Sequence, residues 1–145
     1  MLKLFKKHFQ DLNDDEILSL SIDTLEEDIR LYDDYSSHFL INYPETSKMF
    51  KKMSISKNKN RQQLIKLHKK KFGETLSITN KNKISNFFKR KPQWFVIKNS
   101  IEKVRNEIIE MESISSQFYN SFAKKSKNIE IRNLLIDLAM MSREQ

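Results

Sequence analysis

The sequence is poor in the residues that make tight turns and cross-links. One glycine and two prolines in 145 residues are too few for the many reversals of a β-sandwich or barrel. The absence of cysteine excludes disulfides, thiolate metal sites, cysteine nucleophiles and rubredoxin-type iron centres. No apolar run approaches the roughly 18 residues that span a bilayer, and the basic stretch Met1 to Gln10 has no apolar core or small-residue cleavage site of a secretory signal. We therefore expect one cytoplasmic, all-α domain over residues 1–145.

Four stretches of the chain repeat apolar residues at intervals of three and four, the spacing of one helix face. The first begins after Asn13, an N-cap residue that three acidic residues follow. The second runs over Pro44–Phe72 and ends at Gly73, where a left-handed C-terminal cap is expected. The third starts near Ser100 and the fourth near Asn128. The chain is therefore predicted to form four long helices.

Residues 74–99 separate the first two predicted helices from the last two. Within them Ile84, Phe87 and Phe88 fit a short helix that Pro92 ends. This pattern predicts a ferritin-like four-helix bundle, in which two helical hairpins are joined by a long crossover that contains a short helix. Residues 1–12 form an N-terminal extension in this interpretation.

Basic residues gather in the middle of the chain, although the whole protein is basic at +8. Residues 46–98 contain 16 Lys and Arg and a single Glu, a formal charge of +15, whereas residues 1–45 carry −7. Such a field attracts nucleic acid or an anionic membrane surface, unless it is simply a solvated face. Lysine outnumbers arginine 21 to 6, and lysine lacks the fork used in specific phosphate contacts. The candidate surface contacts are Lys69, Lys70, Lys71, Lys89, Arg90 and Lys91.

Polar side chains interrupt the apolar face of each of the four predicted helices, at corresponding heights along the bundle. Glu26 and Glu112 each follow a residue of the apolar face by four positions, so both carboxylates are expected to point toward the bundle axis. Di-iron bundles carry their ligands at these heights, with one Glu on each of two helices and a Glu-x-x-His pair on each of the others. The remaining interruptions are Lys57 and Asn60 on the second helix and Ser142 and Gln145 on the fourth.

Short sequence words around these positions occur in a consistent order over residues 12–145. They are Leu25-Glu26-Glu27-Asp28-Ile29-Arg30-Leu31-Tyr32, Tyr43-Pro44, Met49-Phe50 with Met53, Arg61 with Leu64, Phe72-Gly73, Met111-Glu112 with Phe118-Tyr119, and Leu134-Leu135 with Asp137-Leu138-Ala139. Together they resemble the ferritin-like domain of the membrane-bound ferritin and iron-exporter branch of the rubrerythrins. The resemblance implies two irons in the bundle, oxidation of ferrous iron, a dimer and, in one branch, a membrane transport domain.

Most of the iron ligands that this resemblance implies are replaced. Glu26 and Glu112 match the two single-helix glutamates. Neither an amide nor a hydroxyl matches the charge or donor strength of the missing carboxylates and imidazoles, so we expect no cofactor, with iron as the one candidate. The residues that stand in place of the two Glu-x-x-His pairs are Lys57, Asn60, Ser142 and Gln145.

Lys57 introduces a positive charge where the family would hold metal. We hypothesise that it replaces the metal as counter-charge and pairs with Glu26 or Glu112, because buried carboxylates require a partner. The alternative is that Lys57 extends into solvent and the glutamates are hydrated. The histidines His8, His38 and His68 are scattered and are expected at surface or boundary positions.

Three functions follow from these observations. The first is a non-catalytic ferritin-like protein related to iron handling, which acts as a homodimeric scaffold or binds a protein partner. The second is a residual iron-binding protein with ferroxidase activity, the one enzymatic reading. The third is a basic adaptor for nucleic acid or an anionic membrane surface, which would make the protein membrane-peripheral.

Overall fold

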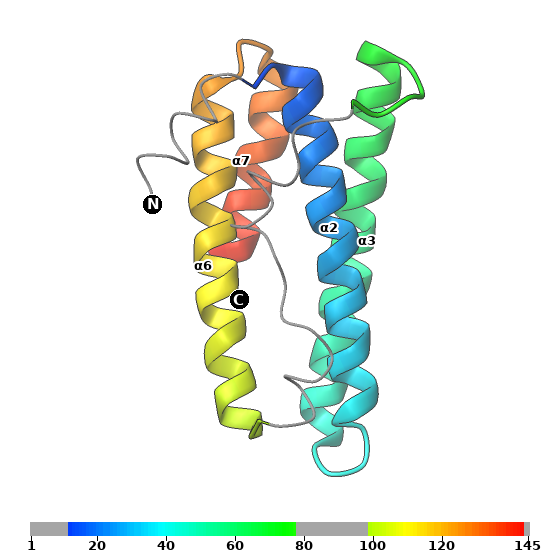
Figure 1. Cartoon of the computed structure of the whole chain (residues 1–145), viewed down its shortest axis with the longest axis vertical. Helices are drawn as coiled ribbons and strands as arrows, with labels where there is room; N and C mark the ends of the chain where they lie inside the picture. The colour runs from blue at the N-terminus through cyan, green and yellow to red at the C-terminus, as the bar shows by residue number, and fades with distance from the viewer. Residues whose placement is uncertain (1–11, 78–98, 144–145) are drawn as a thin grey trace.

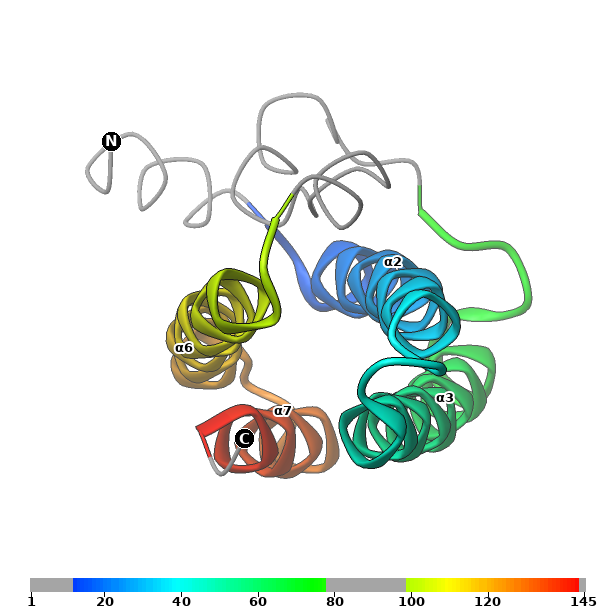
Figure 2. The same ribbon diagram turned by 90° about the horizontal axis from the view of Figure 1, so that it is seen from below.

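The computed structural model describes residues 12–77 and 99–143, which contain four α-helices. They are α2 (Asp14–His38), α3 (Pro44–Phe72), α6 (Ile101–Lys125) and α7 (Ile129–Arg143). The helices form two antiparallel hairpins, α2–α3 and α6–α7 (Figure 1), which lie side by side so that α3 neighbours α7 and α2 neighbours α6 (Figure 2). The predicted four-helix bundle is confirmed. The short helix predicted within the crossover and nearly all of the N-terminal extension lie outside the described residues.

Side-chain caps set the starts of three helices where the sequence predicted them. The Asn13 side chain accepts a hydrogen bond from the Glu16 N–H at 2.8 Å, and the Glu16 carboxylate accepts one from the Asn13 N–H. This reciprocal capping box satisfies two of the N–H groups that a helix start leaves free. Ser100 accepts from the Lys103 N–H, and Asn128 accepts from the Ile131 N–H.

The second helix has the predicted bounds, with Pro44 in its first turn and Gly73 after its last residue. The Gly73 N–H donates to the Lys69 carbonyl at 3.1 Å, which ends the helix. Gly73 has φ +90° and ψ −173°, so the predicted positive φ is present but the ψ is not that of a left-handed helical cap. This extended mirror-image region is open essentially to glycine alone.

The core consists of two apolar clusters at different heights of the bundle. The upper cluster lies toward the end of the bundle where α2 begins. It is centred on Leu18, Leu25, Leu64, Phe122 and Leu135, and all four helices contribute to it. The lower cluster includes Leu31, Tyr32, Tyr35, Phe39, Phe50, Met53, Ile101, Val104 and Ile108, from α2, α3 and α6. The short helix α7 runs beside the C-terminal part of α6 (Figure 1), so it reaches only the upper cluster.

Aromatic rings fill the lower cluster. The rings of Tyr35 and Phe50 have their centroids 5.4 Å apart, and those of Tyr32 and Phe50 stack at 6.2 Å. Burial, with a smaller contribution from the charge of Glu107, raises the pKa of Tyr35 to about 12. The phenol is therefore held in its neutral form.

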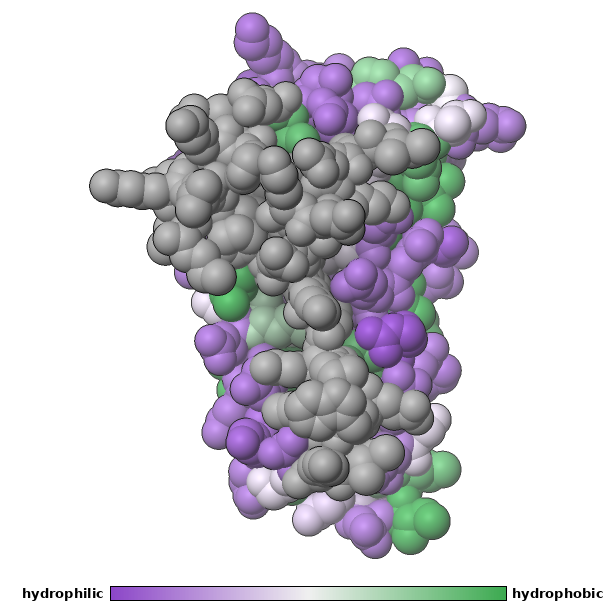
Figure 3. All heavy atoms as spheres, in the orientation of Figure 1, coloured by the Kyte–Doolittle hydropathy of each residue, from purple (hydrophilic) through white to green (hydrophobic). Residues whose placement is uncertain are grey.

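One face of the bundle is largely polar where its described residues are visible. On the face shown in Figure 3, most of the described side chains are hydrophilic and apolar ones appear in small patches. Among the described helices, none combines the length and hydropathy required to cross a membrane.

Candidate functional site

A layer of polar side chains separates the two apolar clusters. We call it the polar layer; it comprises Asp28 of α2, Lys57 and Asn60 of α3, Glu112 and Ser115 of α6, and Ser142 of α7, all of them buried. Helical spacing places them there. On α3, for example, Met53, Lys57, Asn60 and Leu64 follow one another at intervals of four, three and four, and each is buried.

The ammonium of Lys57 lies between two buried carboxylates. Its Nζ is 2.9 Å from Oε1 and 3.0 Å from Oε2 of Glu112, and 3.4 Å from Oδ2 of Asp28. The three side chains are 6%, 1% and 0% exposed. Three charges so far from water are tolerated only when they compensate one another. The prediction that Lys57 pairs with Glu26 or Glu112 is confirmed for Glu112, and the alternative of a solvent-exposed Lys57 is wrong.

A tyrosine completes the surroundings of Glu112. The Tyr32 hydroxyl donates a short hydrogen bond to Glu112 Oε1, the same oxygen that lies nearest the ammonium. Hydrogen bonds to charged groups are stronger than those between neutral groups. Glu112 is thus fixed by two donors from two other helices, α2 and α3.

Glu26 does not face the interior, and this expectation from the sequence is wrong. Its side chain is 48% exposed and accepts a hydrogen bond from Arg61 Nε at 3.2 Å. The acidic residue of α2 in the polar layer is Asp28, two positions later. The series Thr24, Asp28, Leu31 and Tyr35 has spacings of four, three and four and is buried throughout, which is the signal that locates Asp28.

The other predicted interior positions are partly described. Asn60 is buried and donates from Nδ2 to the Met141 sulfur at 3.6 Å, and Ser142 is buried on α7. Gln145 lies outside the described residues. The positions that the resemblance assigns to the two Glu-x-x-His pairs therefore hold an ammonium, an amide and a hydroxyl in the described part of the bundle.

These residues do not fit a di-iron centre. A pair of irons takes four carboxylates and two histidines in this type of bundle, whereas the polar layer offers Asp28 and Glu112 with the ammonium between them. Two unit charges about 4 Å apart, at an effective dielectric near 20, interact with about 4 kcal/mol, so Lys57 strongly opposes a cation there. Within residues 12–77 and 99–143, no group of three or more His, Asp or Glu is arranged to hold a metal.

A second acid–base pair, which the sequence did not indicate, joins a buried histidine to a part-buried aspartate in the upper half of the bundle. His68 was expected at a surface or boundary position but is 1% exposed. Its Nε2 lies 2.6 Å from Asp15 Oδ1, and its Nδ1 lies 3.1 Å from the Gly73 carbonyl oxygen. Both ring nitrogens therefore have a polar partner within hydrogen-bond distance. The pair ties the start of α2 to the end of α3.

The candidate basic surface residues that the structure describes form ion pairs with acidic residues of the same chain. Lys69 lies 3.1 Å from Glu74, and both Lys70 and Lys71 lie 3.3 Å from Glu130. Hydrogen bonds first from Lys71 and then from Lys70 lower the pKa of Glu130. The predicted contacts Lys89, Arg90 and Lys91 lie outside the described residues.

Comparison with known proteins supports the family that the fold and the heights of the polar layer indicate. The family model described as Rubrerythrin matches residues 16–144, which include all four helices. Searches of curated proteins and of solved structures find no match. A match over this length, together with the two-hairpin bundle, shows that the chain belongs to the rubrerythrin family.

Proposed function

We propose that this protein is a metal-independent member of the rubrerythrin family that acts as a scaffold or partner-binding module rather than as a ferroxidase. The family fold is retained, but the positive charge in the polar layer is the ammonium of Lys57. The observation that carries the proposal is the position of Lys57 Nζ, 2.9 Å from Glu112 and 3.4 Å from Asp28 in the bundle interior.

The charges of the polar layer support this role. Removal of the Lys57 ammonium would leave two carboxylates buried side by side, which is costly without a counter-charge. The ammonium therefore has a structural role that a metal fulfils in a di-iron bundle. It also joins α3 to both α2 and α6, so it stabilises the arrangement of the two hairpins without any bound ion.

The proposal is tested by the iron content and oxidase activity of the protein. Protein produced in iron-supplemented medium and purified without chelator should contain far less than one iron per chain by mass spectrometry of metals. It should not accelerate the oxidation of ferrous iron above buffer. One or two irons per chain, bound by Asp28 or Glu112, would refute the proposal.

A charge-restoring variant provides the matched comparison. Lys57→Glu combined with Asn60→His places a Glu-x-x-His pair on α3 and changes the formal charge of the polar layer from −1 to −3. If Lys57 is the residue that excludes metal, this variant should bind more iron, cobalt or zinc than the wild type. Equal metal content in the two proteins would show that Lys57 is not the determinant.

A further inference from the structure

The polar layer brings together the two groups from which an amide bond can form. Lys57 Nζ lies 2.9 Å from Oε1 and 3.0 Å from Oε2 of Glu112. Because Nζ is close to both oxygens, it is also close to Cδ, the carbon that joins them, within the roughly 3–3.5 Å of a near-attack geometry. The two side chains belong to different hairpins and are 6% and 1% exposed. An amine and a carboxyl group are thus held in contact away from water.

Asp28 is placed to move the proton that such a reaction requires. An ammonium becomes a nucleophile only after it loses a proton, and a carboxyl oxygen leaves most readily as water. Asp28 Oδ2 lies 3.4 Å from Lys57 Nζ and its side chain is 0% exposed, so a small side-chain movement brings the two atoms to hydrogen-bond distance. A carboxylate at this distance can accept a proton as the new bond forms and return it to the leaving group.

Tyr32 is placed to stabilise the charge that develops on the carboxyl group. Its buried hydroxyl donates a short hydrogen bond to Glu112 Oε1. When a nitrogen attacks Cδ, one of the two carboxyl oxygens gains negative charge. A donor that already points at this oxygen acts as an oxyanion hole does, because it needs no rearrangement at the moment of reaction.

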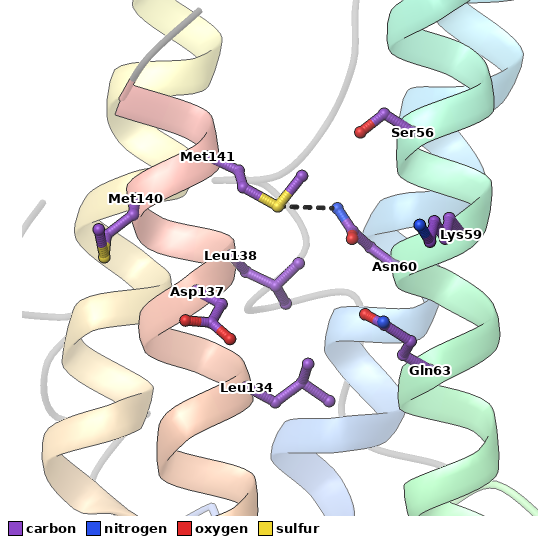
Figure 4. Close-up of a pocket in the computed structure, with 9 residues that line it drawn as sticks. All are labelled: Ser56, Lys59, Asn60, Gln63, Leu134, Asp137, Leu138, Met140 and Met141. Carbon is purple, nitrogen blue, oxygen red and sulfur yellow. Dashed lines mark hydrogen bonds between the residues drawn. The ribbon is translucent and has the colours of Figure 1, made fainter.

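The site is closed on the side of α7. A surface hollow of about 440 Å³ between α3 and α7 is lined by Asn60 but not by Lys57, one turn away. The Asn60 side chain crosses this hollow to the Met141 sulfur, with Leu138 beside it (Figure 4). Condensation would convert two buried charges into a neutral amide, and buried charge is costly. The closed interior therefore favours the amide and limits its hydrolysis.

We propose that Lys57 and Glu112 condense to form an intramolecular amide bond, with Asp28 and Tyr32 as the catalytic residues. A proton first passes from Nζ to Oε2 of Glu112, which leaves a neutral amine and a neutral acid. The amine attacks Cδ, its extra proton passes to Asp28, and negative charge collects on Oε1 beside Tyr32. Asp28 then returns the proton to Oε2, the Cδ–Oε2 bond breaks and water leaves. One amine and one acid give one amide and one water, so no oxidant or other reactant is consumed.

The bond would link α3 to α6 and so join the two hairpins covalently. The inference goes beyond the proposed function, because it assigns a reaction to the polar layer that does not depend on any partner. The exposed pairs of Lys70 and Lys71 with Glu130, both at 3.3 Å, provide an internal comparison. They lie in water, where an ion pair is stable without condensation, and are expected to remain ionic.

The test is the mass of the intact, denatured chain after incubation of the folded protein at neutral pH. Wild type should be lighter than its sequence mass by one water molecule. Lys57→Arg keeps the positive charge but lacks the amine nucleophile, so it should retain the full mass of its sequence. Lys70→Met, the matched control at an exposed ion pair, should lose one water as wild type does.

Peptide mapping locates the bond. Trypsin cannot cleave after a lysine whose amine is in an amide, so peptides 53–59 and 106–124 should be recovered as one linked species. Cyclisation of an aspartate to a succinimide gives the same loss of mass but leaves the cleavage after Lys57 intact. The map therefore separates the two reactions.

Two variants test the catalytic residues, because both keep Lys57 and Glu112. In time courses of freshly synthesised protein, Asp28→Asn should slow formation of the bond by about 10²–10⁴-fold, and Tyr32→Phe by about 10²–10³-fold. Circular dichroism verifies that each variant is folded. A folded variant that reacts at the wild-type rate would overturn the role of the substituted residue.

The mass of wild type decides the bond itself, whatever the folding of the variants. A folded wild type that keeps its full sequence mass after prolonged incubation would overturn the inference. So would a loss of water that maps to residues other than Lys57 and Glu112.

Discussion

Lys57 and Lys59 lie two residues apart on α3 and have opposite environments. Lys57 is 6% exposed and lies within 3.4 Å of two carboxylates from α2 and α6. Lys59 is exposed at the surface, where it lines a hollow between α3 and α7. Two residues rotate a helix by about 200°, which moves a side chain from the bundle axis to the surface. The same residue type therefore compensates buried charges at one position and is exposed at the surface at the other.

Substitution of each lysine by methionine should separate these roles most clearly. Lys57→Met should lower the free energy of unfolding by about 3–5 kcal/mol at neutral pH, because Asp28 and Glu112 lose their buried counter-charge. Lys59→Met, the matched control, should change it by less than about 0.5 kcal/mol. Chemical denaturation monitored by circular dichroism measures both. Similar values for the two variants would show that the interior lysine and the surface lysine contribute equally to stability.

A double-mutant cycle should attribute the loss to the ion pair. Lys57→Met combined with Glu112→Gln removes one charge of each sign, so it should cost less than the sum of the two single substitutions by about 0.5–3 kcal/mol. Additive costs would mean that Lys57 acts through packing alone.

The Tyr32 hydroxyl gives a smaller effect within the same layer. Tyr32→Phe keeps the ring stacked on Phe50 but removes the hydrogen bond to Glu112, and should cost about 1.5–3 kcal/mol, the range for a bond to a charged group. Tyr43→Phe, at a 43% exposed tyrosine, is the control and should be nearly neutral. Thermal unfolding compares the two, and an equal shift in both would argue against a role for the buried hydroxyl.

The last effect is absent at neutral pH and should emerge only in alkaline solution. The folded-state pKa of Tyr35 is raised to about 12 from an ordinary value near 10. Its contribution is therefore fully present below about pH 10 and is lost as pH rises toward 12, because the unfolded chain ionises first. Tyr35→Phe should show a shallower decline of stability with pH over this window than wild type. Parallel curves for Tyr35→Phe and wild type would contradict the assignment.

The sequence predicted the fold well because the helix signals are local. Asn13, Pro44 and Ser100 mark helix starts through their own side chains or ring, and Gly73 marks an end through its backbone freedom. Each signal acts within one turn of the helix. Tertiary packing was not required to place these boundaries, and the structure reproduces them.

The candidate site was predicted less well because it depends on helix rotation. Lys57, Asn60, Glu112 and Ser142 are interior as expected. On α2, however, three consecutive acidic residues, Glu26, Glu27 and Asp28, compete for the interior position, and successive residues differ by only 100°. The buried face of α2 is broad enough to include the residues at helical spacing that pass through Thr24 and Asp28. Packing of α2 against α3 and α6 therefore decides that Asp28 is the acidic residue in the interior. His68 was missed because its partner, Asp15, is 53 residues away in the sequence.

The contacts of Lys57 also bear on how the chain folds. Asp28 belongs to the same hairpin as Lys57, whereas Glu112 belongs to the other. If the α2–α3 hairpin formed alone, Asp28 and Lys57 would be exposed to water, where an ion pair contributes little to stability. The charges of Asp28, Lys57 and Glu112 come together in the interior only when α6 packs against the first hairpin. We therefore expect the two hairpins to become stable together, in a single cooperative transition rather than as independent units.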